Sequence, residues 1–283
     1  MGLTSLILWI VCTPSMASMA TDSPSNGLQD RYKKWMNKHS REYKSREEQE
    51  RRFTVYQLNV QYIDNFNSLN HSYTLAENSF ADLTNDEFKT TYLGYQTHCL
   101  PDTCFRYDHL ESLSEQELVD CDIISGNQGC DGGFMNKAFE YIKRSGLTTE
   151  REYPYRGIEA FCNTQKVRYH SVTISGYEKV PTNNEKKLKA AVAHQPVSVA
   201  IDAGGYDFQF YSSGIFSGSC GKQLNHGVAI VGYGEVGDNT YWLVKNSWGT
   251  EWGESGYIRM KRDSIDKRGA CGIAMEASYP TKD

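Results

Sequence analysis

The sequence lacks an excess of basic charge and has no long apolar segment beyond its first 20 residues. Its 30 lysine and arginine residues are outnumbered by 35 aspartate and glutamate residues, which gives a net charge of −5. Proteins that bind nucleic acids usually carry a basic face, so this balance argues against that class. No later segment is apolar enough to cross a bilayer, and there is no internal repeat or low-complexity stretch. The 283 residues suffice for two ordinary domains or for one domain with a long appendage.

The N-terminus has the pattern of a secretory signal. Residues 3–11 include an apolar run too short to span a membrane, and the small residues Ala17, Ser18 and Ala20 follow in a cleavage-like spacing. Lysine and arginine, which usually precede the apolar run, are missing. We expect residues 1–20 to be a signal peptide that directs the chain to the secretory pathway, and onward to the vacuole or lysosome or the extracellular space. The alternative is an apolar, disordered N-terminal segment.

The cysteine count is odd once the expected signal is removed. Of eight cysteines, Cys12 lies in the signal, and seven remain for the mature chain. In an oxidising compartment an odd number predicts at least one unpaired thiol or an intermolecular bond. The seven are Cys99, Cys104, Cys121, Cys130, Cys162, Cys220 and Cys271.

Residues 29–67 have a helical pattern and a high density of charge. Ser45 followed by Glu48 predicts a capping box, in which the two side chains satisfy the free amide donors at a helix start. An apolar stripe at helical spacing then follows on one face. On this pattern alone, the segment could also be a solvated charged helix or a short coiled coil. The stripe consists of Phe53, Tyr56, Val60 and Ile63.

Two interlocking motifs favour a more specific interpretation of this segment. Glu48, Arg52, Tyr56, Asn59, Ile63 and Asn67 stand at the spacing of one motif, and Ala76, Asn78, Phe80 and Asp82 at that of a second. Both resemble propeptide motifs of the papain family, with Tyr56 where that family usually has Phe and Ala76 where it has Gly. The resemblance implies that residues 28–90 form an all-α inhibitory prodomain of the I29 type. The sequon at Asn70 would accept a glycan.

The pattern of the remaining residues predicts a linker followed by an α+β domain. Residues 91–111 are polar and aperiodic, which predicts a linker. Two helices are expected next. The first opens with a capping box of Ser114 and Glu117 and ends near Cys121, and the second covers residues 134–145 and ends at Gly146. Strands are expected over 197–201, 228–231, 241–244 and 257–260, with turns at 237–239 and 253–256. Helices followed by antiparallel strands indicate an α+β fold.

A histidine and an asparagine twenty residues apart suggest the base half of a nucleophilic catalytic site. They are His226, in an Asn-His-Gly run, and Asn246, in Asn-Ser-Trp-Gly. An amide that holds one imidazole nitrogen leaves the other to accept a proton from a cysteine thiol. Such a cysteine is expected about 130–150 residues upstream, in a Cys-Gly-(Ser/Ala)-Cys-aromatic run. That run occurs neither there nor elsewhere in the sequence. Isolated residues of these types are more often ordinary packing or surface groups.

The flanking runs decide between these interpretations. From Leu113 to Pro280 the chain resembles papain-like cysteine endopeptidases, most closely the plant senescence-associated type. The resemblance implies a two-lobe fold, with a helical left lobe and an antiparallel β-barrel right lobe. It also implies that His226 is the proton acceptor, that Asn246 orients it and that Trp248 covers their hydrogen bond. The runs are Leu-Ser-Glu-Gln-Glu-Leu-Val-Asp-Cys at 113–121, Gly-Cys-Asp-Gly-Gly at 129–133, Asn-His-Gly at 225–227, Asn-Ser-Trp-Gly at 246–249 and Cys-Gly-Ile-Ala at 271–274.

The resemblance also implies a substrate cleft. Gly132 and Gly133 match the backbone wall to which the family binds an extended peptide, and glycine suits such a close approach. Glu276 matches the base of the specificity pocket, where an acid would admit basic side chains. The remaining candidates for the cleft could equally be ordinary packing. They are Phe134, Met135, Ala200, Leu224 and Asn225.

The same resemblance implies the disulfides Cys121–Cys162 and Cys220–Cys271. Cys130 matches a structural cysteine of the family whose partner lies in the absent segment. We therefore expect it to be unpaired, in a mixed disulfide, or scrambled with Cys99 or Cys104. Although Gln-Gly-Cys-Asp at 128–131 superficially resembles a nucleophile run, Cys130 is not expected to be the nucleophile.

The departure from the family lies just before Leu113. In the family, the mature N-terminus, the oxyanion-hole glutamine and the nucleophile lie between the linker and this part of the domain. In this chain these features are absent, and the linker joins directly to the peptidase domain at 112–283. We therefore expect a papain-family endopeptidase precursor that is catalytically dead and monomeric, with peptide or protein substrates by family and no cofactor or metal. The alternatives are a prodomain-type inhibitor of related cysteine proteases, or an unstable product of splicing or of an erroneous gene model. A lost disulfide costs about 2–5 kcal/mol, a large part of a typical stability.

Overall fold

The computed structural model describes residues 24–93, 111–168 and 170–283, in two compact units divided after Glu42. The expected signal peptide, most of the expected linker, and Cys12, Cys99 and Cys104 lie outside the described residues. In the first unit, helix α1 (Pro24–Lys38) carries Tyr32 and Trp35 with their rings stacked at 5.9 Å. The Arg41 guanidinium lies 5.8 Å from the centre of the Trp35 ring, at a cation–π distance.

The second unit opens with the helices that the prodomain motifs predict. Helix α2 (Arg46–Asn67) begins at Ser45, whose hydroxyl accepts a hydrogen bond from the Glu48 N–H. Helix α3 (Asn85–Tyr92) has a complete capping box between Thr84 and Glu87. These caps satisfy amide donors that a helix start otherwise leaves free.

Helix α2 buries polar motif residues beside its apolar stripe. Tyr56, Val60 and Ile63 are buried, and so is Asn59. The Asn59 amide donates to the carbonyls of Ala81 and Leu83, both at 2.9 Å. Asn59 therefore ties the helix to the loop that leads into α3.

Arg52 makes the second tie between α2 and α3. Its guanidinium donates to Glu48 at 2.9 Å, to Glu87 at 2.8 Å and to the Asp82 carbonyl at 3.0 Å. Burial alone would raise the pKa of Glu87, but the Thr84 amide and the Arg52 charge together lower that pKa to about 2. The motif spacing thus reflects contacts within the prodomain.

The expectation of an all-helical prodomain is wrong in one respect. Residues Tyr73–Leu75 form strand β1, which pairs antiparallel with β4 (Tyr211–Phe216) of the peptidase domain. The Asn67 side chain holds the connection from α2 by bonding both the N–H and the carbonyl of Leu75. An edge strand of a sheet offers unpaired backbone groups, and β1 satisfies those of β4.

The left lobe is built on two short helices, as expected. It contains α4 (Glu115–Cys121), η1 (Gly129–Asp131), α5 (Met135–Ser145) and η2 (Lys166–Arg168). Gly146 ends α5 with a φ of 79°, and its N–H donates to the Ile142 carbonyl. A cluster of buried apolar residues fills the lobe. Its members are Leu113, Leu118, Cys121, Ala138, Phe139, Tyr141, Ile142, Leu147, Tyr153, Val172 and Ile174.

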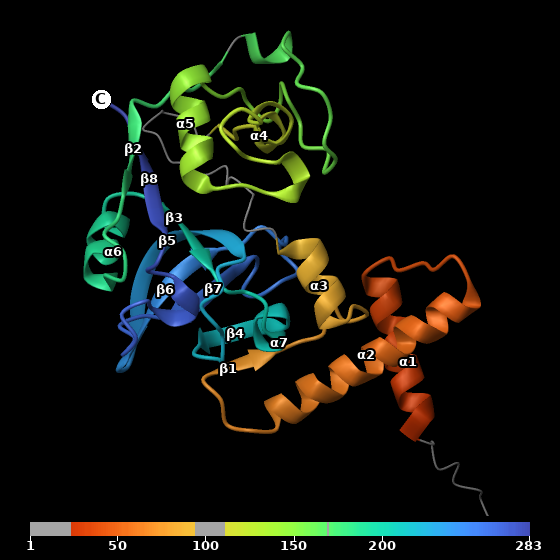
Figure 1. The fold of residues 1–283 in the computed structure, drawn as a ribbon. Helices are drawn as coiled ribbons and strands as arrows, with labels where there is room; N and C mark the ends of the chain where they lie inside the picture. The colour runs from red at the N-terminus through yellow and green to blue at the C-terminus, as the bar shows by residue number, and fades with distance from the viewer. Residues whose placement is uncertain (1–23, 94–110, 169) are drawn as a thin grey trace, which may run out of the picture. The chain divides into compact units, whose positions relative to one another are not determined.

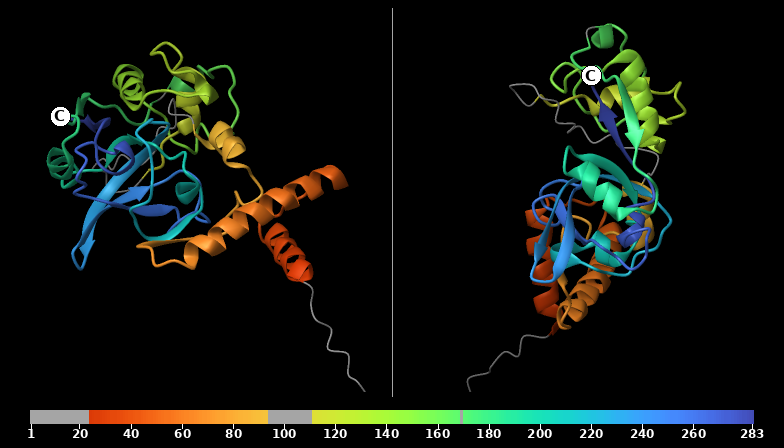
Figure 2. Two further views of the ribbon diagram at one scale, coloured as in Figure 1. Left: turned by 60° about the horizontal axis from the view of Figure 1, so that its bottom comes forward. Right: turned by 90° about the vertical axis from the view of Figure 1, so that its left-hand side faces the viewer.

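The right lobe is built around one sheet, whose strand order is β1-β4-β7-β6-β5-β3-β8-β2. The pairs are antiparallel except β4–β7, so the expected antiparallel barrel is, over the described residues, a sheet of linear order with one parallel pair. Figure 1 shows β2 and β8 running from this sheet toward α5, and Figure 2 shows the same arrangement from two other sides. The remaining elements are β2 (Gly176–Lys179), α6 (Glu185–Val192), β3 (Val197–Ile201), α7 (Tyr206–Gln209), β5 (His226–Val236), β6 (Asn239–Lys245), β7 (Tyr257–Lys261), η3 (Ala270–Gly272) and β8 (Ala277–Thr281).

The predicted strands and both predicted turns are present. The turn before β7 requires glycine at position 253, where φ is 60° and a Cβ atom would lie 2.5 Å from the Tyr257 carbonyl oxygen. Side chains rarely adopt such a φ, and the close approach adds a steric clash.

The Asn59 contacts predict the effect of its removal. Asn59→Ala leaves the buried Ala81 carbonyl and the partly buried Leu83 carbonyl without this donor, and we expect the free energy of unfolding to fall by about 1–3 kcal/mol. Urea denaturation followed by circular dichroism measures this change. Asn65→Ala on the exposed face of the same helix is the matched control. Equal stabilities for the two variants would contradict the proposed tie.

Candidate active site

The pairing of β5 with β6 brings His226 and Asn246 together. His226 is the first residue of β5, and Asn246 directly follows β6, whose last residue Lys245 lies opposite Ala229. Both residues are buried, at 1% and 5% exposure. The His226 Nε2 lies 2.7 Å from the Asn246 Oδ1.

The surroundings of Asn246 determine which imidazole nitrogen carries the proton. The Asn246 Oδ1 also accepts a hydrogen bond from the Ser247 N–H at 2.8 Å, which identifies it as the acceptor atom of the amide. The His226 Nε2 must therefore be the donor. In the neutral ring, Nδ1 then carries the lone pair and can accept a proton.

The indole of Trp248 covers this hydrogen bond. Its ring is stacked on the His226 imidazole at 4.7 Å between centroids and 26° between planes. Phe88 of α3 and Phe80 of the preceding loop pack edge-on against Trp248, at 5.2 and 5.8 Å. Phe208 packs against it in the same way, at 5.6 Å. The prodomain therefore contributes to the aromatic wall that shields the site from water.

Asp202 fixes the loop that precedes His226. Its carboxylate accepts hydrogen bonds from the Gly204 and Gln223 amides and from the Asn225 side chain, at 3.0–3.2 Å. The Asn225 Oδ1 in turn accepts the Ala203 N–H at 2.8 Å. The side chain of Asn225, which the sequence suggested for substrate binding, is thus engaged in holding the loop.

The other predicted cleft residues lie in two places. In the left lobe, Asn127 accepts the Phe134 N–H at 2.8 Å, while Gly132 adopts a φ of 113° just before α5. Gly133 is buried there, and Met135 is the first residue of α5. In the right lobe, the pairing of β3 with β8 joins the Ala200 N–H to the Glu276 carbonyl at 3.0 Å.

Leu224 lies close to the same part of the right lobe. A Cβ atom at Gly272 would come within 2.8 Å of the Leu224 side chain. Glu276 itself is exposed. The role of all these residues in substrate binding stays a prediction.

Comparison with known proteins identifies families that match both parts of the chain. The family model "Papain family cysteine protease" matches residues 97–281, and the "Cathepsin propeptide inhibitor domain (I29)" matches residues 32–88. The chain is 43% identical to the senescence-specific cysteine protease SAG12 of Arabidopsis thaliana, over 90% of both chains. It is 45% identical to the KDEL-tailed cysteine endopeptidase CEP2 of the same plant, over 90% of this chain and 86% of the relative.

The chain belongs to the papain family of cysteine proteases. Its fold is similar to that of the recombinant stem bromelain precursor, with a TM-score of 0.83 and 36% identity over 91% of this chain and 99% of the other. The ragweed pollen allergen Amb a 11 in its proform gives a TM-score of 0.82 and 35% identity, over 91% and 95%. The alignments with SAG12 and CEP2 extend over 317 and 314 positions, more than the 283 residues present here. Residues of both relatives therefore stand opposite gaps in this chain.

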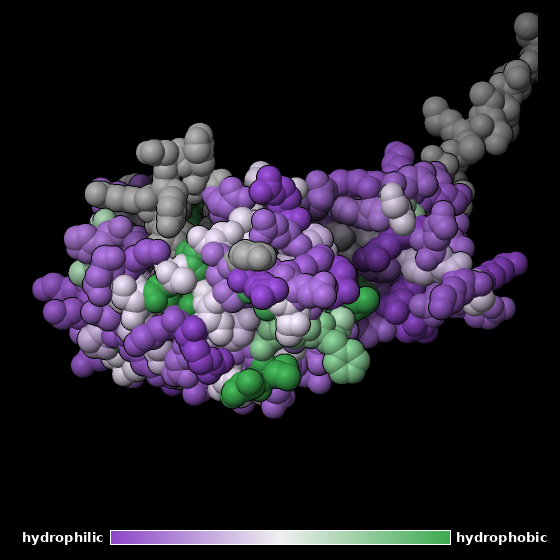
Figure 3. Space-filling model, turned by 90° about the horizontal axis from the view of Figure 1, so that it is seen from above, coloured by the Kyte–Doolittle hydropathy of each residue, from purple (hydrophilic) through white to green (hydrophobic). Residues whose placement is uncertain are grey.

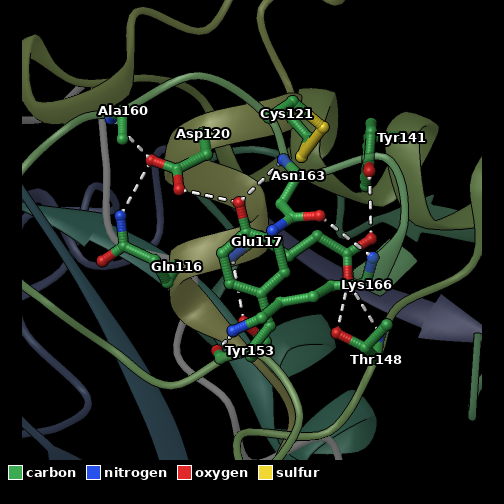
Figure 4. The surroundings of a disulfide bond; sticks show 12 residues. Gln116, Glu117, Asp120, Cys121, Tyr141, Thr148, Tyr153, Ala160, Asn163 and Lys166 are labelled. Carbon is green, nitrogen blue, oxygen red and sulfur yellow. Dashed lines mark hydrogen bonds between the residues drawn. A yellow bond between two sulfur atoms is a disulfide. The ribbon is translucent and has the colours of Figure 1, made fainter.

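Both disulfides that the family resemblance implied are present in the structure. Cys121 is bonded to Cys162 and Cys220 to Cys271. Figure 4 shows the first of them at the end of α4, beside a network of buried polar groups.

That network corrects the expected capping box at the start of α4. Ser114 caps the helix by accepting the Glu117 N–H. The Glu117 carboxylate does not return to Ser114, because it is fully buried and accepts from the Tyr141 hydroxyl, from Thr148 and from His170, at 2.7–3.1 Å. Figure 4 shows Tyr141 and Thr148 converging on it.

Asp120, one turn further along α4, is held in the same way. Its carboxylate accepts from Gln116 and the Ala160 N–H at 2.9 Å, from the Tyr153 hydroxyl at 2.8 Å and from Arg156 at 2.6 Å. Buried carboxylates require such donors, since a charge without them is strongly destabilised. Sequence reasoning missed both roles, although two acids in a short helix flanked by apolar residues were a visible signal.

Cys130 is a free thiol and is exposed. Its N–H lies 3.4 Å from the Glu159 carboxylate. Burial and the Glu159 charge raise the pKa of the Cys130 thiol above its ordinary value. A thiol that is held protonated is a poor nucleophile, since the thiolate is the reactive form. The surroundings of Cys130 therefore differ from those that activate a catalytic cysteine.

The left lobe leaves several apolar side chains in contact with solvent. Phe161 is 99% exposed, Ile124 83% and Ile158 64%. Figure 3 shows the molecule from above, with green apolar patches between the purple polar residues.

Two further features concern only the described ranges 24–93, 111–168 and 170–283. No helix there has both the length and the apolar character needed to cross a membrane. No group of three His, Cys, Asp or Glu side chains in these ranges is arranged to hold a metal ion.

The acidic pair Glu115–Glu150 at the start of α4 predicts a pH dependence. Burial and the Glu150 carboxyl raise the pKa of Glu115 from 4.5 to about 7. The folded lobe binds this proton more tightly than the unfolded chain, so its stabilising contribution is complete below about pH 4.5 and is lost as the pH rises through about 7. Glu115→Gln should therefore raise the melting temperature at pH 8 and change it little at pH 4.5.

Thermal unfolding of the variant and of the original chain at both pH values measures this difference. Glu152→Gln, at an acid in the same region, controls for the general effect of removing a negative charge. A Glu115→Gln variant that is destabilised equally at both pH values would contradict the role assigned to the pair.

The environment of Cys130 predicts slow alkylation. Iodoacetamide should modify Cys130 in the folded chain and leave the four disulfide-bonded cysteines intact. The rate should keep increasing at alkaline pH beyond the point at which an ordinary cysteine thiol is ionised, because the pKa of Cys130 is raised. Peptide mapping by mass spectrometry measures the extent, with Cys130→Ser as the control. A Cys130 found in a unique intrachain disulfide would show that this prediction is wrong.

Proposed function

We propose that this chain is a papain-family protease precursor that retains the base half of the catalytic apparatus and does not hydrolyse peptide bonds. Two observations together support the loss of the nucleophile. The sequence contains no Cys-Gly-(Ser/Ala)-Cys-aromatic run, and its family alignments are longer than the chain itself. The members of such a catalytic set act as a unit, so the loss of one removes nearly the whole effect of the set.

The geometry at His226 defines what this half-site can do. The Asn246 amide holds Nε2 in the protonated form, so Nδ1 is prepared to accept a proton from a thiol. In an active family member, the resulting thiolate attacks the carbonyl carbon of a peptide substrate. An imidazole held in this way can activate a thiol nucleophile, but it does not itself attack the peptide carbonyl.

The alternative of a free-standing inhibitor has less support. The prodomain packs onto the right lobe of its own chain, through the β1–β4 pairing and through Phe80 and Phe88 on Trp248. To inhibit a relative, the prodomain would have to exchange these contacts for equivalent ones elsewhere. Intramolecular contacts have the advantage of a high effective concentration.

We further propose that the chain enters the secretory pathway, with the vacuole or the extracellular space as its destination. Both disulfides support this, since such bonds persist in oxidising compartments. The expected signal peptide lies outside the described residues. Peptide and protein substrates follow from the family, and the monomeric state remains a prediction.

The test of the proposal is the reaction with an epoxide that alkylates the nucleophile of active papain-like enzymes. We expect the purified chain to show no labelling and no hydrolysis of peptide–coumarin substrates at acidic pH. A commercial papain preparation serves as the positive control, and His226→Ala as the matched variant.

Labelling that disappears in His226→Ala would contradict the proposal. In that case, Cys99→Ser, Cys104→Ser and Cys130→Ser identify the reactive thiol, because these cysteines lie outside the expected signal and the two disulfides. Weak labelling that persists in His226→Ala would indicate an ordinary exposed thiol and leave the proposal standing.

A further inference from the structure

A cavity of about 310 Å³ lies at the far end of the parallel strand pair, on structure that the catalytic half-site does not use. Because β4 and β7 run parallel, their carboxyl ends meet at one edge of the sheet. The segments that follow them form two walls, and η3 forms the third. The lining residues are Ser217, Gly218, Ser219, Cys220, Lys222, Lys261, Asp263, Ser264, Ile265, Ala270 and Cys271.

The disulfide Cys220–Cys271 links two of these walls covalently. The loop after β4 is thereby held against η3, so these two walls of the cavity stay together. A volume near 300 Å³ is at the lower end of the range for small-molecule sites. The cavity can therefore accommodate a ligand about the size of a monosaccharide.

The cavity has a positive lining, because its only carboxylate is already engaged. Asp263 is paired with Arg262 at 2.9 Å and also accepts the Thr240 hydroxyl. Lys222 donates to the Gly269 carbonyl at 2.9 Å, which leaves further donors of its ammonium available. Within the described residues, the ammonium of Lys261 has neither an ion pair nor a hydrogen bond to another side chain.

Carboxylates beside the cavity are also occupied by other partners. Glu185 accepts the Ser264 N–H and the Trp242 indole N–H, both at 2.9 Å, and Asp202 accepts the Gln223 N–H at 3.1 Å. Asp266 is paired with Arg268 at 2.9 Å, and Lys222 makes only a minor contribution to the low pKa of Asp266. Asp207, close to Gly218, accepts hydrogen bonds from the hydroxyls of Tyr62 and Tyr73. The two lysines are thus left to interact with an anion from solution.

Serine hydroxyls supplement the lysines. Ser217, Ser219 and Ser264 line the cavity, and the Ser217 hydroxyl lies 2.8 Å from that of Ser72. A tetrahedral oxyanion accepts several hydrogen bonds at once, and those from charged donors are the strongest. Two ammonium groups with adjacent hydroxyls suit such a group better than a neutral ligand.

We propose that this cavity binds a small hydroxylated molecule that carries one phosphate or sulfate group, such as a sugar phosphate or a sugar sulfate. The oxyanion lies between Lys222 and Lys261, and the serine hydroxyls bind the remainder of the molecule. Binding requires neither His226 nor a nucleophile, so the site functions in a catalytically inactive chain.

Isothermal titration calorimetry of the full chain tests the proposal, with glucose 6-phosphate, glucose 6-sulfate, glucose and inorganic phosphate as separate ligands. We expect binding of at least one of the two esters and none of glucose. Lys261→Ala should weaken that binding about tenfold or more, since it removes a charge-assisted hydrogen bond. Lys222→Ala should act in the same direction. Lys143→Ala, at an exposed lysine of α5 in the left lobe, is the matched control and should leave the affinity unchanged.

Three results would overturn the proposal. They are the absence of binding of either ester at about 10 mM ligand, equal binding of glucose and the esters, and an equal loss of affinity in Lys261→Ala and Lys143→Ala. Thermal unfolding of each variant separates a lost contact from a lost fold. If Lys222→Ala does not fold, Lys261→Ala still decides, because its side chain is exposed. The relative affinities of the sulfate and phosphate esters then identify the natural class.

Discussion

The antiparallel pairing of β5 with β6 is the constraint on which the candidate site depends. Its register sets the start of one strand beside the end of the other, and so brings together two residues that are twenty positions apart in the sequence. The hydrogen bond from His226 to Asn246 then selects the tautomer of the ring. Trp248, two residues further along, can only stack on the imidazole because the chain leaves β6 at this point. A one-residue slip in the register would turn every side chain of β6 to the opposite face and dismantle the pair.

The prodomain contributes to the sheet and to the aromatic residues around the candidate site. Strand β1 extends the same sheet at β4, while Phe80 and Phe88 pack against the ring that covers the site. The contacts of Arg52 and Asn59 stay within the prodomain and give it the shape that these outward contacts need. The contacts within the prodomain and its contacts with the right lobe are made by different residues. A substitution in the prodomain can therefore change its own fold without changing its packing on the right lobe, or the reverse.

Much of the local structure could be predicted from the sequence, and the limits have physical causes. Strands over 197–201 and 241–244 follow from alternation and β-branched side chains, which are local properties. The pairing of Cys121 with Cys162 and of Cys220 with Cys271 came from the family resemblance, because spacing alone leaves many connectivities open. Strand β1 was missed because three residues carry too little periodicity, and its formation depends on a distant partner. The parallel β4–β7 pair was missed for the same reason.

Glu117 shows most clearly why the left lobe was difficult to predict. From the sequence it resembled an ordinary capping acid, and its real role depends on three donors 24 to 53 positions later in the chain. Asp120 depends in the same way on Tyr153, Arg156 and Ala160. All these donors follow Leu113, so the polar centre of the lobe is complete within residues 114–170. Both buried carboxylates are satisfied there, while Cys130 is a free thiol and Phe161 and Ile124 are exposed at the surface of the same lobe.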